Sequence, residues 1–149
     1  MRQGGQAILS GSVAILAICC CCGRAASAAP CDPPAPIRFG AGATSTEIMG
    51  GIARGELVCF TFKAERGQHA SVSQADPGDT NIVMQLYRPR WMIAHTSDGI
   101  EVRGLPLPGA KEGDDAKGWV GTLPASGRYL LILGASWGGG PYHVRIKLE

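Results

Sequence analysis

One segment near the C-terminus matches a catalytic motif. Gly134-Ala135-Ser136-Trp137-Gly138 fits the G-x-S-x-G pattern of serine hydrolases, in which the serine stands on a strand-turn-helix elbow and an acid and a histidine follow later in the chain. Here glycines and Pro141 follow, so no helix can begin, no Asp comes after Ser136, and His143 falls within a short strand pattern. We therefore interpret the motif as a hairpin loop, reject a catalytic triad, and predict that the protein is not an enzyme.

Metal-ligand patterns are weak. Asp76, Asp79 and Asn81 offer closely spaced oxygen ligands that suit Ca²⁺, but the EF-hand spacing is absent and these are ordinary turn residues. Zinc is disfavoured because the cysteines and histidines that remain after the N-terminal leader show no ligand spacing (Cys31, Cys59, His69, His95, His143). The sequence predicts no metal site and no cofactor, with calcium kept as an alternative.

Other side chains could serve binding or glycoside chemistry. Glu101, Glu112 and Asp114 would supply carboxylates for glycoside hydrolysis, but acids in loops are ordinarily solvated. The three histidines occupy outward or strand-end positions, and we expect them to be solvated as well. The tryptophans could form a sugar-stacking platform; Trp91 and Trp119 lie in strand patterns that suit a core or rim role. Trp137 lies in a Gly-rich loop, so we expect it to be exposed and to contact a partner.

The first 28 residues have the features of a secretory signal peptide. Arg2 provides a positive start, Ala7–Cys22 is largely apolar, and Ala26-Ser27-Ala28 fits a cleavage site. Small residues and prolines follow rather than a basic stop-transfer flank, so we expect no membrane anchor after cleavage. Lipid attachment at the Cys19–Cys22 run is the alternative, although Ile18 is a poor residue to precede it. The predicted location is periplasmic or secreted.

Removal of this leader changes the cysteine and charge counts. Four of the six cysteines leave with it, and Cys31 and Cys59 are expected to form one disulfide in an exported protein. Arg2 and Arg24 also leave, so 14 basic residues become 12 against 12 acidic ones, and the net charge falls from +2 to zero. A neutral chain gives no electrostatic reason to expect nucleic acid or an anionic membrane as partner. The oligomeric state stays open.

The mature chain is rich in turn residues and short strand patterns. Alternating or apolar runs predict about eight strands, at residues 47–52, 56–64, 68–74, 81–87, 91–95, 118–123, 128–133 and 142–149, while residues 104–117 are expected to form a surface loop. The run at 128–133 is apolar on both faces, so it should lie inside a sheet. We predict an all-β protein: one antiparallel β-sandwich, jelly-roll-like, over residues 38–149, after a Pro-rich segment at 29–37.

Three places along the chain carry a family resemblance. They are Phe39-Gly40 through Gly50-Gly51-Ile52, Phe60–Ala64 with the Gly67-Gln68 turn, and Leu123-Pro124-Ala125-Ser126-Gly127-Arg128-Tyr129. With these, the chain from Arg38 onward resembles bacterial periplasmic inhibitors of g-type lysozyme and, more broadly, the pre-peptidase C-terminal-like β-sandwich. The final alternating strand also fits.

This resemblance implies a non-enzymatic protein that inserts a loop into the cleft of a lysozyme. The implied partner-binding residues are Ser126, Gly127, Arg128 and Tyr129, to which the sequence adds Trp137. One departure is that the loop before the last strand is long and basic in these inhibitors, whereas residues 134–141 here are short and uncharged. The alternative function is a binding or structural module for envelope glycan or protein, with calcium as an optional ligand.

Overall fold

The computed structural model describes residues 31–75 and 81–149, which fold as strands and loops. Ten strands lie in this part of the chain: β1 (Ala35–Pro36), β2 (Ser45–Ile52), β3 (Leu57–Ala64), β4 (His69–Gln74), β5 (Ile82–Tyr87), β6 (Met92–Thr96), β7 (Gly99–Arg103), β8 (Gly118–Thr122), β9 (Gly127–Ala135) and β10 (Gly140–Leu148). The eight predicted strands are all present, within a few residues of their predicted bounds. The sequence patterns missed β1 and β7.

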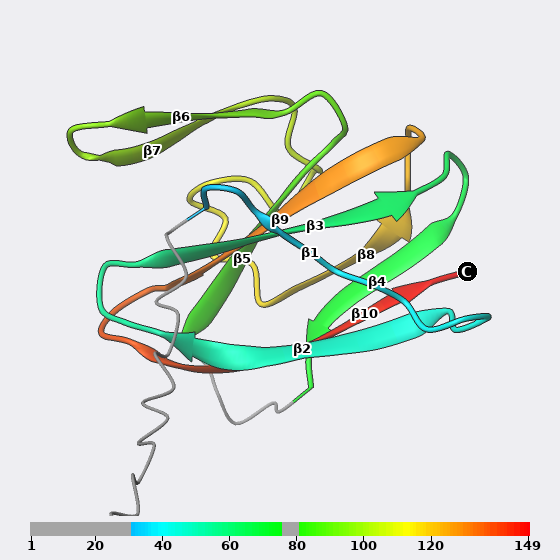
Figure 1. Ribbon diagram of the computed structural model, residues 1–149, viewed down its shortest axis with the longest axis horizontal. Helices are drawn as coiled ribbons and strands as arrows, with labels where there is room; N and C mark the ends of the chain where they lie inside the picture. The colour runs from blue at the N-terminus through cyan, green and yellow to red at the C-terminus, as the bar shows by residue number, and fades with distance from the viewer. Residues whose placement is uncertain (1–30, 76–80) are drawn as a thin grey trace, which may run out of the picture.

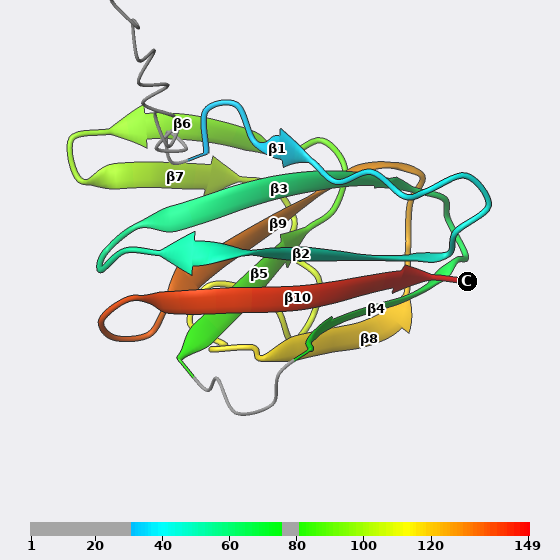
Figure 2. The ribbon, with the colours of Figure 1, turned by 60° about the horizontal axis from the view of Figure 1, so that its bottom comes forward.

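The strands form a sandwich of two four-stranded sheets (Figures 1 and 2). The first sheet has the order β1-β3-β9-β5 and the second has the order β2-β10-β4-β8. Strands from the two halves of the chain pair antiparallel, β2 with β10, β3 with β9 and β4 with β8, as in a long hairpin wound into a jelly roll. The predicted fold class is therefore confirmed, and β9 lies inside a sheet as its two apolar faces predicted.

The main core fills the space between the two sheets. Ile82, Met84 and Leu86 of β5 are at most 1% exposed, and alternate residues of β9 and β10 meet them from both sheets. Two aromatic pairs, Phe62 with Tyr129 and Phe60 with Tyr142, lie in this layer. The period of two in these strands places one apolar row inside, as the sequence pattern indicated.

A smaller core covers the outer face of the first sheet. The β6–β7 hairpin lies over this face, above the sandwich in Figure 1, and packs Ile93, Ile100 and Val102 toward Leu130 and Ile132 of β9. The predicted Cys31–Cys59 disulfide forms within the same cluster and links the N-terminal segment to β3 across a sequence separation of 28 residues. A cross-link over a loop of this size contributes roughly 3–4 kcal/mol in the chain-entropy treatment.

Residues 104–117 were predicted to form a surface loop, and this prediction is wrong for three of their apolar residues. Leu107, Ala110 and Ala116 are buried in the main core. The backbone of this segment also pairs with β5, where Leu86 N–H donates to Ala110 O (2.9 Å) and Leu107 N–H donates to Leu86 O (2.7 Å). The reason is that β5 is an edge strand, and its outward backbone groups need partners.

Some predictions fall on residues outside the described ranges. The signal peptide (1–28), its cysteine run and Asp76 and Asp79 of the calcium alternative belong to this part of the chain. The domain bounds at 29–37 and 38–149 remain predictions, although Cys31 and β1 are attached to the sandwich. Within the described residues, no helix is long and apolar enough to span a membrane.

Candidate binding site at the Ser126 turn

The Ser126 turn joins β8 to β9 at one end of the sandwich, beside the β3–β4 turn. Arg66 N–H donates to Ser126 Oγ (2.9 Å), Gly67 N–H donates to Leu123 O (2.9 Å) and Leu123 N–H donates to Gln68 O (2.8 Å). These three bonds fasten the two turns together, so the Ser126 turn is held in place before any partner arrives. Ser126 Oγ accepts the bond from Arg66, which leaves its own hydroxyl proton free to be donated.

Gly127 is required by the shape of this turn. Its φ is +141°, a conformation that residues with a Cβ rarely adopt, and a Cβ built here would lie 2.8 Å from Pro89 Cβ. The turn therefore packs its backbone directly on the β5–β6 loop. Gly127 shapes the site and offers no side chain to a partner.

Tyr129 was expected to contact a partner, and the structure places it in the core instead. It is 0% exposed and stacks on Phe62 with ring centroids 5.5 Å apart. Its hydroxyl donates to Ala125 O (2.7 Å) and accepts from Ala125 N–H (3.2 Å). Burial raises the pKa of Tyr129, so the hydroxyl stays protonated and keeps donating. Tyr129 points inward because it is the next strand residue after the outward-facing Arg128.

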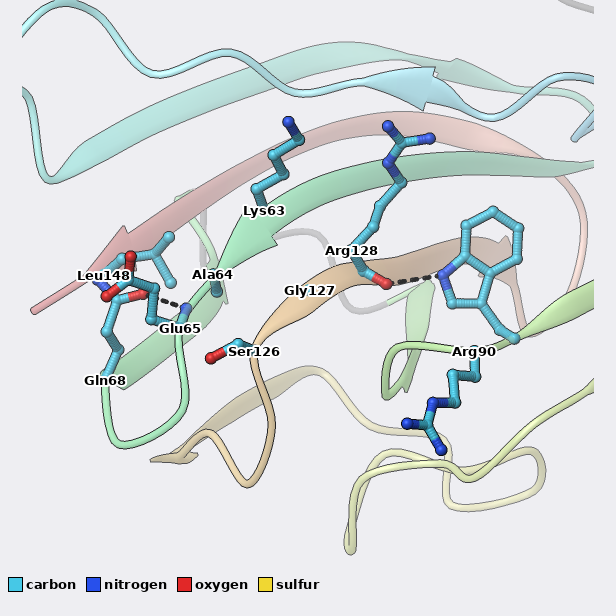
Figure 3. A pocket seen from close by; sticks show the side chains of 10 residues that line it. Lys63, Ala64, Glu65, Gln68, Arg90, Ser126, Gly127, Arg128 and Leu148 are labelled. Atoms are coloured by element: carbon cyan, nitrogen blue, oxygen red, sulfur yellow. Dashed lines mark hydrogen bonds between the residues drawn. The ribbon is translucent and has the colours of Figure 1, made fainter.

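A groove of about 750 Å³ lies beside the turn (Figure 3). It is lined by residues from five segments of the chain: Lys63, Ala64, Glu65, Gln68, Arg90, Trp91, Ser126, Gly127, Arg128 and Leu148. Trp91 Nε1–H donates to Arg128 O (2.9 Å), which fixes the indole against the start of β9. Three of the predicted site residues, Ser126, Gly127 and Arg128, thus line one groove.

The groove carries a local excess of positive charge. Lys63 and Arg128 are direct cross-strand partners of β3 and β9, and Arg90 reaches the groove from the β5–β6 loop, whereas Glu65 is its one acidic lining residue. Figure 3 shows the Lys63 and Arg128 side chains rising from the same side of the two strands. Within the described ranges, none of these three cations forms an ion pair. The groove therefore presents a basic surface at this end of the sandwich.

Trp137 is as exposed as predicted, at 81%, but it does not belong to this groove. It lies in the β9–β10 hairpin, and the nine residues of β9 separate it from the Ser126 turn by about 30 Å at 3.3 Å per residue. Asn81 Oδ1 accepts from Trp137 N–H (3.1 Å), which holds this hairpin at the opposite end of the sandwich. The five predicted partner-binding residues therefore do not form one site.

The catalytic motif is a hairpin, as interpreted from the sequence. Ser136 Oγ–H donates to Asn81 O (3.0 Å).

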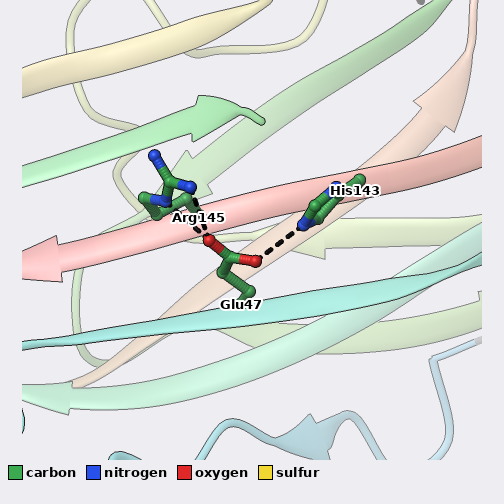
Figure 4. A network of polar contacts seen from close by, with 3 residues as sticks. All are labelled: Glu47, His143 and Arg145. Carbon is green, nitrogen blue, oxygen red and sulfur yellow. Dashed lines mark hydrogen bonds and ion pairs between the residues drawn. The ribbon is translucent and has the colours of Figure 1, made fainter. Parts of the chain in front are cut away.

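His143 lies on β10 with its Nε2 2.8 Å from Glu47 Oε2, and Arg145 Nε donates to Glu47 Oε1 at 2.7 Å (Figure 4). His143 was expected to be solvated, but it is partly buried within this cross-strand network. These hydrogen bonds lower the pKa of Glu47, the bond from His143 most.

Two of the candidate carboxylates are also occupied locally. Glu101 pairs with Arg103 at 3.2 Å, and Asp114 Oδ2 accepts from Lys111 N–H at 3.0 Å. Among residues 31–75 and 81–149, no group of three or more His, Cys, Asp or Glu side chains is arranged to hold a metal ion.

Seven of the ten groove residues come from other segments, and the sequence reasoning did not connect them to the Ser126 turn; Lys63, Glu65, Arg90 and Trp91 are among them. Lys63 lies 65 positions before Arg128, and only the β3–β9 register makes them neighbours. The available signals were the Phe60–Ala64 segment and the Gly67-Gln68 turn of the family resemblance, which contain Lys63, Ala64 and Gln68.

Comparison with known proteins gives no match to any family model and none to any curated sequence. Among solved structures, the fold is similar to that of Aeromonas hydrophila PliG, a periplasmic lysozyme inhibitor of g-type lysozyme, with a TM-score of 0.57 and 22% identity over 78% of this chain and 96% of that chain. PliG of Salmonella Typhimurium gives 0.53 and 23%, over 78% and 97%. A mutant of Escherichia coli PliG gives 0.53 and 22%, over 78% and 97%. The resemblance read from the sequence is therefore confirmed in the fold, which this chain shares with these inhibitors.

Proposed function

We propose that this chain is an exported, non-enzymatic inhibitor of a lysozyme, g-type in the first instance, and that it acts by inserting the Ser126 turn into the enzyme's cleft. The observation that carries the proposal is the groove in which Ser126, Lys63, Arg90 and Arg128 converge around a braced turn. The fold shared with PliG inhibitors supports the same function and a periplasmic location.

The chemistry of the groove complements that of a glycosidase cleft. Glycoside hydrolases commonly place Asp and Glu carboxylates beside the bond they cleave. The free hydroxyl proton of Ser126 can be donated to such a carboxylate, and the guanidinium of Arg128 can pair with it through two parallel hydrogen bonds. Because the turn is already fastened to the β3–β4 turn, insertion costs little ordering entropy.

The basic surface supplies positive charge that the loop before the last strand lacks. Residues 134–141 are uncharged, unlike the basic loop expected of such inhibitors, but the positive charge here comes from three other elements: β3, the β5–β6 loop and β9. Attraction toward an acidic cleft is therefore local to one end of the molecule and needs no net charge on the whole chain.

The test is inhibition of a g-type lysozyme by the chain without its leader. Stoichiometric protein should slow the clearing of a peptidoglycan suspension, and Arg128→Ala should raise the half-inhibitory concentration about tenfold, as expected when one partner of an interfacial charge pair is lost. Arg54→Ala is the matched control, because Arg54 is an exposed arginine at the opposite end of the sandwich.

A wild-type chain that slows none of the g-, c- and i-type lysozymes would contradict the proposal. Equal losses for Arg128→Ala and Arg54→Ala would leave inhibition standing but remove the Ser126 turn as its site.

A further inference from the structure

A second groove, of about 660 Å³, lies next to the Ser126 groove. Its lining residues come from the N-terminal segment, β3 and the start of β9: Pro34, Pro36, Ile37, Arg38, Phe39, Thr61, Phe62, Lys63 and Arg128. The two grooves have Lys63 and Arg128 in common and no other lining residue. These two cations therefore form the boundary between the grooves, and either groove can use them.

The second groove brings a further cation to this boundary. Arg38 is exposed, and it follows Ile37, whose N–H donates to Thr61 O (2.7 Å) on β3. This bond attaches the segment carrying Arg38 to the strand that carries Lys63. The lining residues include three cations and no acid, and none of the three makes an ion pair with any residue in the described ranges.

Concentrating these charges has an energetic cost. Lys63 and Arg128 stand directly opposite each other on neighbouring antiparallel strands, where like charges destabilise a sheet. In the described part of the chain no carboxylate offsets this repulsion through an ion pair. Anionic groups supplied from outside would relieve it, so the arrangement favours an acidic ligand over a neutral one.

We infer that the interface with the partner continues from the Ser126 turn across Lys63 and Arg128 into the second groove, where Arg38 meets a further acidic group on the partner protein. This inference rests on the proposed function and extends it. A partner would have to carry carboxylates on the rim of its cleft as well as inside it, and a lysozyme with a neutral or basic rim would bind more weakly. Arg38 thus contributes to the choice of partner.

The experiment measures association and dissociation rates with an immobilised g-type lysozyme for the chain without its leader. Arg38→Ala should raise Kd about fivefold, mainly by slowing association, and Arg38→Glu should raise it more than about tenfold, while Arg38→Lys should stay close to wild type. The loss for Arg38→Ala should shrink between about 0.05 M and about 0.5 M salt, because added ions screen an exposed charge. Arg54→Ala is again the matched control, and a melting curve verifies that each variant is folded.

The outcomes separate the two proposals. If wild type and Arg38→Ala bind equally well, or if Arg38→Glu binds no worse than Arg38→Ala, the second groove is not part of the interface and the Ser126 turn stands alone. If the wild-type chain binds no lysozyme, the proposed function fails and this extension fails with it.

Discussion

At the scale of single residues, the four residues of the Ser-Gly-Arg-Tyr stretch serve different purposes: some face the groove and one supports the turn from the core. Ser126 and Arg128 face the groove, Gly127 supplies a backbone shape that a Cβ would obstruct, and Tyr129 is buried beneath them. The sequence reasoning assigned all four residues to partner contact, whereas the structure places three of them along the groove and Tyr129 in the core. Strand alternation corrects this, because a residue that follows an outward-facing one points into the core.

The first prediction concerns the hydroxyl of Tyr129. Tyr129→Phe keeps the ring stacked on Phe62 but removes the oxygen that bonds both backbone groups of Ala125. Leaving these part-buried backbone groups unpaired costs about 1–3 kcal/mol, so the free energy of unfolding in urea should fall by up to that amount. Inhibition should weaken as well, because the Ser126 turn loses its internal support.

Tyr142→Phe is the control for this prediction. Tyr142 is a partly buried aromatic residue packed against the main core, with its ring centroid 5.9 Å from that of Phe60, and its hydroxyl makes no hydrogen bond with the described residues. Its substitution should change stability much less. If the two variants lose equal stability, the Tyr129 hydroxyl does not brace the turn.

At the scale of elements, the segment 104–117 acts as part of the sandwich rather than as a connection. It forms hydrogen bonds with the backbone groups on the outer edge of β5 and places Leu107 in the main core, where it is 1% exposed. Leu107→Ala should therefore lower the free energy of unfolding by about 2–5 kcal/mol, the range for removing a buried leucine side chain. Chemical denaturation measures this directly.

Leu105→Ala provides the comparison, since Leu105 lies two positions earlier in the same segment and is 67% exposed. It should change stability by less than about 0.5 kcal/mol. A small effect from both variants would mean that the segment is a dispensable surface loop, as its composition alone indicated.

The predictable elements were those whose side chains alternate. β10 shows a period of two in the sequence because one of its faces meets the core. β1 has two residues, Ala35 and Pro36, which is too short for any period to appear.

The burial of segment 104–117 has no local signal, because it depends on the unpaired edge of β5, a strand distant in sequence. The basic groove was unpredictable for the same reason: Lys63 and Arg128 become neighbours only through the register of β3 and β9.

At the scale of the whole molecule, the jelly roll gives the sandwich two separate ends. The Ser126 turn, the β3–β4 turn and the β5–β6 loop gather at one end, while the β2–β3 turn and the β9–β10 hairpin lie at the other. The cations of the groove lie at the first end: Lys63, Arg90 and Arg128. The exposed Trp137 lies at the second end. A compact partner cleft that receives the Ser126 turn cannot also reach Trp137.

The last prediction follows from this separation. Trp137→Ala should leave the inhibition of a g-type lysozyme within about twofold of wild type, whereas Arg128→Ala weakens it about tenfold, because only Arg128 lines the groove. The melting temperature of Trp137→Ala should also stay close to wild type, since an 81% exposed side chain contributes little to the core. The same clearing assay compares both variants. A loss of inhibition for Trp137→Ala as large as that for Arg128→Ala would place the β9–β10 hairpin in the interface, and the Ser126 turn would then not be the inserted element.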